Sequence, residues 1–261
     1  MAKKISLLLK LKEEYPQYNK DELTAFVVCK NVYVNNELVT NPKVKVDISC
    51  NIELAFGKFV SRGGLKMEKA LEAFDIDVRD KVVLDAGSST GGFTDCLLQH
   101  GAKHVHSVDV GYNQLAWKLR ADERVIVHEK QNIMTLESLD PPADLAVCDL
   151  SFRSIKNAAS HILKLCGNTQ LICLIKPQFE VPKWKSDFSG VVEDMNFLVD
   201  VLNHVYDILL EDEVYVKDVI LSPIKGRKGN IEFLSLLTKE EGMNKRDFTN
   251  KILQLIPPLK D

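Results

Sequence analysis

The chain has 261 residues, of which 45% are hydrophobic and 27% are charged, and this ordinary globular composition argues against a disordered protein. The length exceeds one average domain, so a large α/β domain with a smaller companion is expected. A formal net charge of −3 excludes a protein that coats nucleic acid over its whole surface.

The apolar segments are too short to span a bilayer, the longest lying near residues 171–175. Lys10 and Lys12 interrupt the leading apolar residues before a secretory core forms, so a cytoplasmic protein is expected. The 6 cysteines show no C-x-x-C pairing, which argues against both a metal site and a disulfide framework. We therefore expect reduced thiols and no bound metal.

The first 56 residues alternate helical and extended patterns. Helical spacing occurs at residues 5–11 and 20–29, and Asn19 with Glu22 three residues later forms a capping pattern. Short strands are then predicted at residues 31–39 (a hairpin turning at Asn35-Asn36), 44–48 and 52–54. This region predicts a small α+β domain over 1–56, joined by a short linker, 57–61, to a second domain, 62–261.

The second domain reads as a doubly wound α/β sheet. A helix is predicted at residues 64–74. Strands are predicted at residues 81–85, 104–109, 124–128, 143–149, 169–175, 214–221 and 230–237. The last two strands are separated by a proline- and glycine-containing loop instead of a helix, which predicts a terminal antiparallel hairpin of the kind found in Rossmann-like methyltransferases.

A glycine-rich turn follows the first of these strands. The string from Asp85 to Gly91 reads D-x-G-x-S-x-G and leads into a helix that contains Phe93. Dinucleotide-binding loops read G-x-G-x-x-G and place a pyrophosphate at a helix N-terminus, where Asp85 would repel it. The cationic methyl donor S-adenosylmethionine fits better, so its binding is predicted here. Asp109 ends the next strand, where a carboxylate accepts hydrogen bonds from a cofactor ribose.

Four polar residues lie at predicted element ends where a cleft would form: Lys66, Asp149, Lys176 and Glu232. Together they suit methyl transfer to a ribose 2′-hydroxyl. Lys176 is the best candidate to act on that hydroxyl, either as a desolvated neutral base or as a cation that stabilises the alkoxide. Asp149 and Glu232 would orient the two lysines.

Each of the four residues has a plainer interpretation. Lys66 could be an exposed helix lysine, Asp149 could cap a helix that begins near residue 154, and Glu232 could pair with Lys217 across the hairpin. Lys176 is the hardest to explain structurally, because it stands between a buried strand and a proline.

Two clusters of basic residues suit contacts with phosphates, one at 225–228 and the other around Trp184. We expect the polar segment 180–190 to be mobile and to close over a flipped-out target nucleotide, with Trp184 stacking on a base. The candidate RNA contacts are Lys20, Lys30, Arg62, Lys183, Trp184, Lys185, Arg227 and Lys228.

Long strings spread over residues 5–237 resemble the TlyA family. They are the segments 61–66, 85–96, 108–112, 114–120, 149–152 and 176–180. The helix pair and hairpin near the N-terminus resemble the alpha-L RNA-binding module of the ribosomal-protein-S-four type, with Asn36 where glycine is usual and Asn19-Lys20 where Ser-Arg is common.

The resemblance implies an alpha-L module joined to an FtsJ-like methyltransferase domain that modifies the 2′-oxygen of cytidines in ribosomal RNA of the small subunit, the large subunit or both. It implies a Lys-Asp-Lys-Glu tetrad at Lys66, Asp149, Lys176 and Glu232. It places the donor at Asp85, Gly87, Ser89, Gly91, Phe93, Asp109, Asn132 and Ile133. The implied partner is ribosomal RNA, with no obligate protein partner and no membrane.

Two other functions remain open from the sequence. Members of the family are often called haemolysins, so a membrane-active protein is one alternative, although no long amphipathic or transmembrane segment supports it. A ribosome assembly factor that binds RNA without catalysis is the other. The intact tetrad speaks against that second function.

Overall fold

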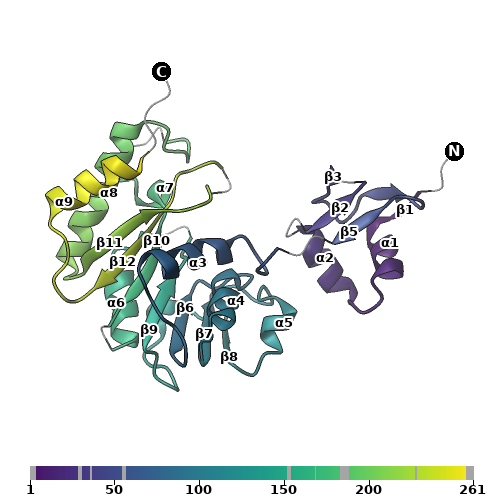
Figure 1. Cartoon of the computed structure of the whole chain (residues 1–261), viewed down its shortest axis with the longest axis horizontal. Helices are drawn as coiled ribbons and strands as arrows, with labels where there is room; N and C mark the ends of the chain where they lie inside the picture. Colours follow the sequence, from purple (N-terminus) through teal and green to yellow (C-terminus); the bar gives the residue numbers. More distant parts are fainter. Residues whose placement is uncertain are drawn as a thin grey trace. The chain divides into compact units, whose positions relative to one another are not determined.

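The computed structural model describes residues 4–28, 31–35, 37–54, 57–151, 154–167, 169–182, 188–226 and 228–256. The chain divides into two compact units, Met1–Arg62 and Gly63–Asp261. Figure 1 shows the elements of each unit.

The N-terminal unit is a small α+β domain. Its helices are α1 (Leu7–Glu14) and α2 (Lys20–Val28), and its strands are β1 (Lys4–Ser6), β2 (Val32–Val34), β3 (Glu37–Leu38), β4 (Lys45–Asp47) and β5 (Ile52–Leu54). The core beneath them contains Leu7, Leu11, Leu23 and Val27, which are fully buried. Both helices therefore bury one apolar side against the strands.

The helix predicted from residue 5 begins later than expected. Residues 4–6 pair antiparallel with β4, and Ile5 lies opposite Val46. Three residues are too few to show the two-residue period of a strand, so residues 5 and 6 were predicted as part of the helix that follows them. The capping pattern is confirmed, because Asn19 Oδ1 accepts the Glu22 amide at 3.0 Å and Glu22 Oε2 accepts the Asn19 amide at 2.6 Å.

The expected hairpin is also present, since β2 pairs antiparallel with β3 and Asn35 has a φ of 49°. Residue 36, the second residue of the predicted turn, lies outside the described residues. The two later strands join different sheets: β4 pairs with β1, whereas β5 pairs with β2.

The C-terminal unit is built on a 7-stranded sheet in the order β11-β12-β10-β9-β6-β7-β8. Its strands are β6 (Val82–Ala86), β7 (His104–Asp109), β8 (Val125–Glu129), β9 (Leu145–Cys148), β10 (Leu171–Ile175), β11 (Tyr215–Leu221) and β12 (Phe233–Thr238). In this sheet β12 is the strand that runs in the opposite direction to the others, and it lies antiparallel between β10 and β11. The doubly wound sheet with its terminal hairpin is confirmed.

Helices cover both sides of this sheet, as Figure 1 shows. They are α3 (Gly63–Ala73), α4 (Gly92–Gln99), α5 (Trp117–Arg120), α6 (Ala158–Leu165), α7 (Pro177–Glu180), α8 (Met195–Glu211) and α9 (Lys245–Leu255), with a short 3-10 helix at Ile133–Thr135. The first parallel strand, β6, is buried along its whole length.

The chain reverses its winding direction around β6, which lies between β7 and β9. In open α/β sheets, ligands bind beyond the carboxyl ends of the strands at such a reversal. The strand order therefore places the ligand site next to Gly87 and Asp149, the residues that follow β6 and β9.

Candidate active site

The glycine-rich turn after β6 follows a path that only small residues tolerate. Gly87 has a φ of +85°, and a Cβ atom there would lie 2.7 Å from the Asp149 carbonyl oxygen. Gly91 also has a positive φ, but its Cβ would meet the side chains of Leu115 and Leu119. The positive φ and the packing against the following segment both favour glycine at position 91.

Asp109 holds the turn from the neighbouring strand. Its Oδ2 accepts the Ser89 amide at 2.9 Å, and its Oδ1 accepts the Gly111 amide at 2.6 Å. A carboxylate has about four lone-pair positions, so it retains the capacity to accept further hydrogen bonds. The residue is half-buried at the end of β7, which leaves it open to a ligand.

A cleft of about 330 Å³ opens over this turn and the neighbouring strand ends. Its lining residues come from four chain segments: Gly87, Ser89, Val108, Asp109, Val110, Gln114, Gln131, Asn132, Ile133, Asp149, Leu150 and Ser151. The volume is within the range of small-molecule sites. The cleft joins the predicted donor residues to Asp149 of the predicted tetrad.

The cleft includes five of the eight predicted donor residues, namely Gly87, Ser89, Asp109, Asn132 and Ile133. Asp85, Gly91 and Phe93 are buried and are not among its lining residues. Sequence reasoning missed Gln114 and Ser151, although Ser151 follows a predicted strand end and could have been found by that position. Gln114 carries no such signal.

Asp85 lies inside β6, beneath the turn, and is completely buried. Its Oδ2 accepts the Thr94 hydroxyl at 2.6 Å, while Oδ1 has no hydrogen-bond partner among the described residues. Burial raises the pKa of this carboxyl to about 7; the Thr94 hydrogen bond opposes the rise, and the charge of Asp149 adds to it. Asp85 is therefore a buried titratable group next to the cleft.

The first of two lysine–carboxylate pairs joins the ends of β9 and β10. Lys176 Nζ forms an ion pair with Asp149 and donates to the Ser151 hydroxyl at 2.9 Å. Asp149 and Ser151 both line the cleft, so Lys176 is held at its boundary. Asp149 does not cap a helix near residue 154, because α6 begins at Ala158 with Asn157 as its N-cap residue.

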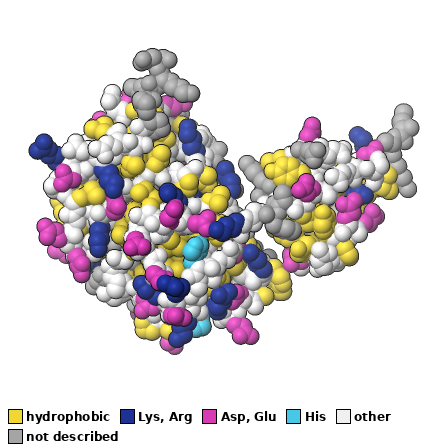
Figure 2. All heavy atoms as spheres, viewed as in Figure 1, with side chains coloured by type: hydrophobic (Ala, Val, Ile, Leu, Met, Phe, Trp, Pro, Cys, Tyr) yellow, Lys and Arg dark blue, Asp and Glu magenta, His cyan; other side chains and the backbone are white. Residues whose placement is uncertain are grey.

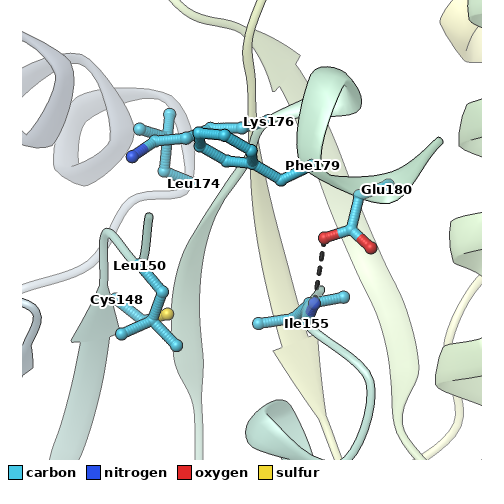
Figure 3. Close-up of a pocket in the computed structure, with 7 residues that line it drawn as sticks. All are labelled: Cys148, Leu150, Ile155, Leu174, Lys176, Phe179 and Glu180. Carbon is cyan, nitrogen blue, oxygen red and sulfur yellow. Dashed lines mark hydrogen bonds between the residues drawn. The ribbon is translucent and has the colours of Figure 1, made fainter. Parts of the chain in front are cut away.

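Figure 3 shows the surroundings of Lys176, with the ring of Phe179 beside its side chain. The nitrogen lies 5.8 Å from the ring centroid. Farther along α7, Glu180 accepts the Ile155 amide at 2.9 Å and the Ser154 hydroxyl at 2.6 Å. Burial raises the pKa of Glu180, and these two hydrogen bonds oppose the rise.

The second pair joins α3 to the loop before β12. Lys66 Nζ lies 2.5 Å from Glu232 Oε2, and both side chains are buried. Glu232 precedes β12 by one residue instead of lying within the strand, because the ladder begins at Phe233 opposite Ile175. Extending that register by one residue places Glu232 opposite Lys176.

The plainer interpretations of this second pair are wrong. Lys66 is not an exposed helix lysine, since only 8% of it is accessible. Lys217 is not the partner of Glu232, because it lies in a register shift between Val216 and Asp218 far along β11. The structure thus unites the tetrad as two ion pairs at one edge of the sheet.

The predicted RNA contacts are only partly described. Lys20, Arg62 and Lys228 are exposed. Lys30, Lys183, Trp184, Lys185 and Arg227 lie outside the described residues. The predicted loop over 180–190 does not begin at residue 180, because Glu180 is the buried last residue of α7.

Two further observations concern metals and membranes. Within the described ranges, no group of His, Cys, Asp and Glu side chains is arranged to hold a metal ion. None of the helices that the structure places is long and apolar enough to cross a membrane.

The sequence of this chain is similar to that of known methyltransferases. Residues 59–239 match the family described as FtsJ-like methyltransferase. The chain is 42% identical over 187 residues to the 16S/23S rRNA (cytidine-2'-O)-methyltransferase TlyA of Mycobacterium tuberculosis, covering 70% of each chain. It is also 42% identical over 209 residues to Hemolysin A of Brachyspira hyodysenteriae, covering 78% of this chain and 87% of that relative.

A solved structure from Streptococcus thermophilus that carries a provisional hemolysin name covers 97% of each chain with a TM-score of 0.72 and 33% identity. The family match spans well over half of the sequence. The predicted family is therefore confirmed, and this chain belongs to the FtsJ-like methyltransferases.

Proposed function

We propose that the protein transfers a methyl group from S-adenosylmethionine to the 2′-hydroxyl of a cytidine in ribosomal RNA. The observation that carries the proposal is the position of Lys176, which is held by two residues of the cleft, Asp149 and Ser151. The activity for which the Mycobacterium tuberculosis relative is named supplies the acceptor. We infer that the protein acts in the cytoplasm, where ribosomes are.

The cleft has the chemistry that this methyl donor requires. Asp109 lies at the end of β7 with lone pairs for ribose hydroxyls, and Ile133 and Val108 provide buried apolar surface for a base. The turn at Gly87 leaves the backbone without a Cβ next to Asp149. When bound, the donor would supply an electrophilic methyl group on a positively charged sulfur.

Lys176 would act on the acceptor hydroxyl. A neutral amine at Nζ would take the hydroxyl proton as the oxygen attacks, whereas an ammonium would stabilise the negative charge that develops on that oxygen. Asp149 orients Nζ in either state. The Lys66–Glu232 pair braces the same edge of the sheet from α3, which helps to hold the acceptor side of the site in place.

RNA recognition is proposed to rely on phosphate contacts and shape. The N-terminal unit has the helix pair and hairpin expected of an alpha-L module, and Lys20 is exposed at the start of α2. Figure 2 shows Lys and Arg side chains mixed with Asp and Glu over the visible face of the second unit, without a uniform basic field. Local basic groups, including Lys228 and Arg62, would therefore supply the phosphate contacts.

A membrane-active protein is not favoured, because the family match over residues 59–239 describes methyltransferases. A non-catalytic RNA-binding factor is not favoured either. Such a factor has no need for two lysine–carboxylate pairs at the edge of a donor cleft.

The test is transfer of labelled methyl from S-adenosylmethionine to purified small subunits, large subunits and protein-free ribosomal RNA. Alkali-resistant label is expected on at least one subunit, because a methylated 2′-oxygen cannot attack the adjacent phosphate. Lys176→Ala should remove the label. Donor binding without label on any RNA would contradict the proposal, and label that persists in Lys176→Ala would contradict the role of the lysine.

A further inference from the structure

Ser151 lies where the donor cleft meets the candidate base. It follows Asp149 by two residues on the loop after β9, and its side chain is exposed. It lines the cleft, and its hydroxyl lies 2.9 Å from Lys176 Nζ. An exposed hydroxyl adds little to folding stability, so this contact calls for another explanation.

The contact restricts the orientation of the lysine nitrogen. A lysine nitrogen has three tetrahedral positions besides its bond to carbon. Ser151 accepts a hydrogen bond at one of them, and the ion-paired carboxylate of Asp149 lies on a second side of the nitrogen. We propose that Ser151 is a positioning residue for Lys176, which together with Asp149 leaves one position of Nζ for the acceptor hydroxyl; this inference rests on the proposed methyl transfer.

The geometry works in both protonation states of the lysine. In the neutral amine, one N–H group donates to Ser151, the Asp149 carboxylate lies on a second side of Nζ, and the third side is left for the lone pair. In the ammonium, a third N–H occupies it. The group that meets the acceptor is therefore directed in the same way whether Lys176 removes a proton or stabilises charge.

The described residues that next follow Ser151 along the chain are anchored to α7. Glu180 accepts hydrogen bonds from Ser154 and Ile155, and the second of these is drawn in Figure 3. Lys176 and Glu180 flank the same short helix, since Lys176 precedes Pro177 and Glu180 ends α7. Ser154 and Ile155 are thus joined to the same short helix whose N-cap residue is Lys176.

The experiment compares Ser151→Ala with Ser151→Thr, which keeps a hydroxyl, and with Ser160→Ala. Ser160 is a matched control, because its hydroxyl accepts from Lys239 Nζ at 3.0 Å on α6 and is not among the cleft residues. Turnover and KM are measured on the ribosomal subunit that accepts label. The Kd of S-adenosylhomocysteine is measured by calorimetry.

Ser151→Ala should lower kcat at least about tenfold, because hydrogen bonds to charged groups have effects of this size. Its KM for the subunit and the Kd should stay within about twofold of wild type, since the lost contact is internal to the protein. Ser151→Thr should recover most of the turnover. Ser160→Ala should match wild type.

Three outcomes would overturn the proposal. Unchanged kcat in Ser151→Ala would show that the hydroxyl does not position Lys176. A higher Kd with unchanged kcat would show a donor contact alone. Equal loss in the alanine and threonine variants would show that the hydroxyl is not the group that acts.

Crystal structures with S-adenosylhomocysteine separate this proposal from the proposed function. Lys176 should occupy one rotamer in the wild type and several in Ser151→Ala, whether or not any RNA accepts a methyl group. A single, unmoved rotamer in the variant would overturn the positioning role. Absence of methyl transfer by the wild type would overturn the proposed function and leave the structural comparison to decide the role of Ser151.

Discussion

The two lysine–carboxylate pairs at the edge of the sheet have the same chemical groups but differ in access. In the Lys66–Glu232 pair, 10% and 4% of the side chains are exposed. In the Lys176–Asp149 pair the lysine is 11% exposed, about as little as Lys66, but the carboxylate is 25% exposed and lines the cleft. Ser151 accepts a hydrogen bond from this lysine. The first pair is sealed and suits a brace, whereas the second can meet a substrate. Access, rather than residue type, separates the two roles.

Replacing the two lysines one at a time is expected to give the largest difference between the pairs in turnover and in the free energy of unfolding. Lys176→Ala should reduce kcat by about a thousandfold, because it removes the group that acts on the acceptor proton. Its free energy of unfolding should change much less than that of Lys66→Ala, which leaves Glu232 charged and buried. Single-turnover methyl transfer and urea denaturation measure the two quantities. Equal stability losses in both variants would break the comparison.

Replacing the carboxylates tests the same difference from the other side. Glu232→Ala should lower the free energy of unfolding by about 3 kcal/mol, because it leaves the Lys66 ammonium buried without its partner. Asp149→Ala should lower the free energy of unfolding by less, since the Asp149 side chain already reaches the cleft. Urea denaturation at a single pH gives both values. A larger loss of stability in Asp149→Ala than in Glu232→Ala would assign the bracing role to the Lys176–Asp149 pair.

A titration sharpens the comparison further, because Asp149 raises the pKa of Asp85 and Glu232 is not among the causes of that shift. Asp149→Asn should lower the pKa of Asp85 from about 7, and Glu232→Gln should leave it unchanged. Carboxyl NMR of the donor-free protein measures both. An unchanged pKa in Asp149→Asn would place the two carboxylates in separate electrostatic environments.

The same shift has a defined effect on stability. The pKa of Asp85 rises from 3.8 to about 7 on folding, so the folded state binds the proton more tightly than the unfolded state. The contribution of Asp85 to stability is therefore greatest below about pH 4 and falls as the pH rises to about 7. Asp85→Asn should remove that fall, as urea denaturation between these pH values would show. A fall of the same size in the variant would assign it to other groups.

The smallest effect is expected at Lys217, the other lysine considered for Glu232. Lys217→Ala should change the free energy of unfolding by less than about 0.5 kcal/mol, because the side chain is exposed at a strand irregularity. Thermal denaturation beside Lys66→Ala provides the contrast. A loss similar to that of Lys66→Ala would mean that Glu232 depends on both lysines.

The sequence predicted the sheet well because the central parallel strands are short and rich in apolar residues, and several of them end at or next to a polar residue. Asp109, Asp149 and Lys176 were found by that rule, and the sheet brings their ends together. The pairing of Lys66 with Glu232 depends on folding across 166 positions, so no local pattern could show which lysine meets which carboxylate.

The roles of Ser151, Gly91 and Asp85 were harder to predict from the sequence. Ser151 is one exposed serine in a loop, and its importance appears only when Lys176 lies beside it. Gly91 has the conformation of a ligand-binding glycine, yet its close neighbours are leucines from the next segment. Asp85 was predicted to face the donor, but β6 is buried along its whole length and Asp85 lies in the interior with Thr94.

The missing side chain at Gly87 has a consequence for protein engineering. The glycine-rich turn passes so close to the Asp149 backbone at Gly87 that there is no room for a methyl group on its α-carbon. One wall therefore serves both the pocket that would hold the donor and the strand end that carries the carboxylate. Affinity and turnover cannot be adjusted separately at this position, so directed evolution of donor preference would have to begin at cleft residues from another chain segment, such as Gln131 and Ile133.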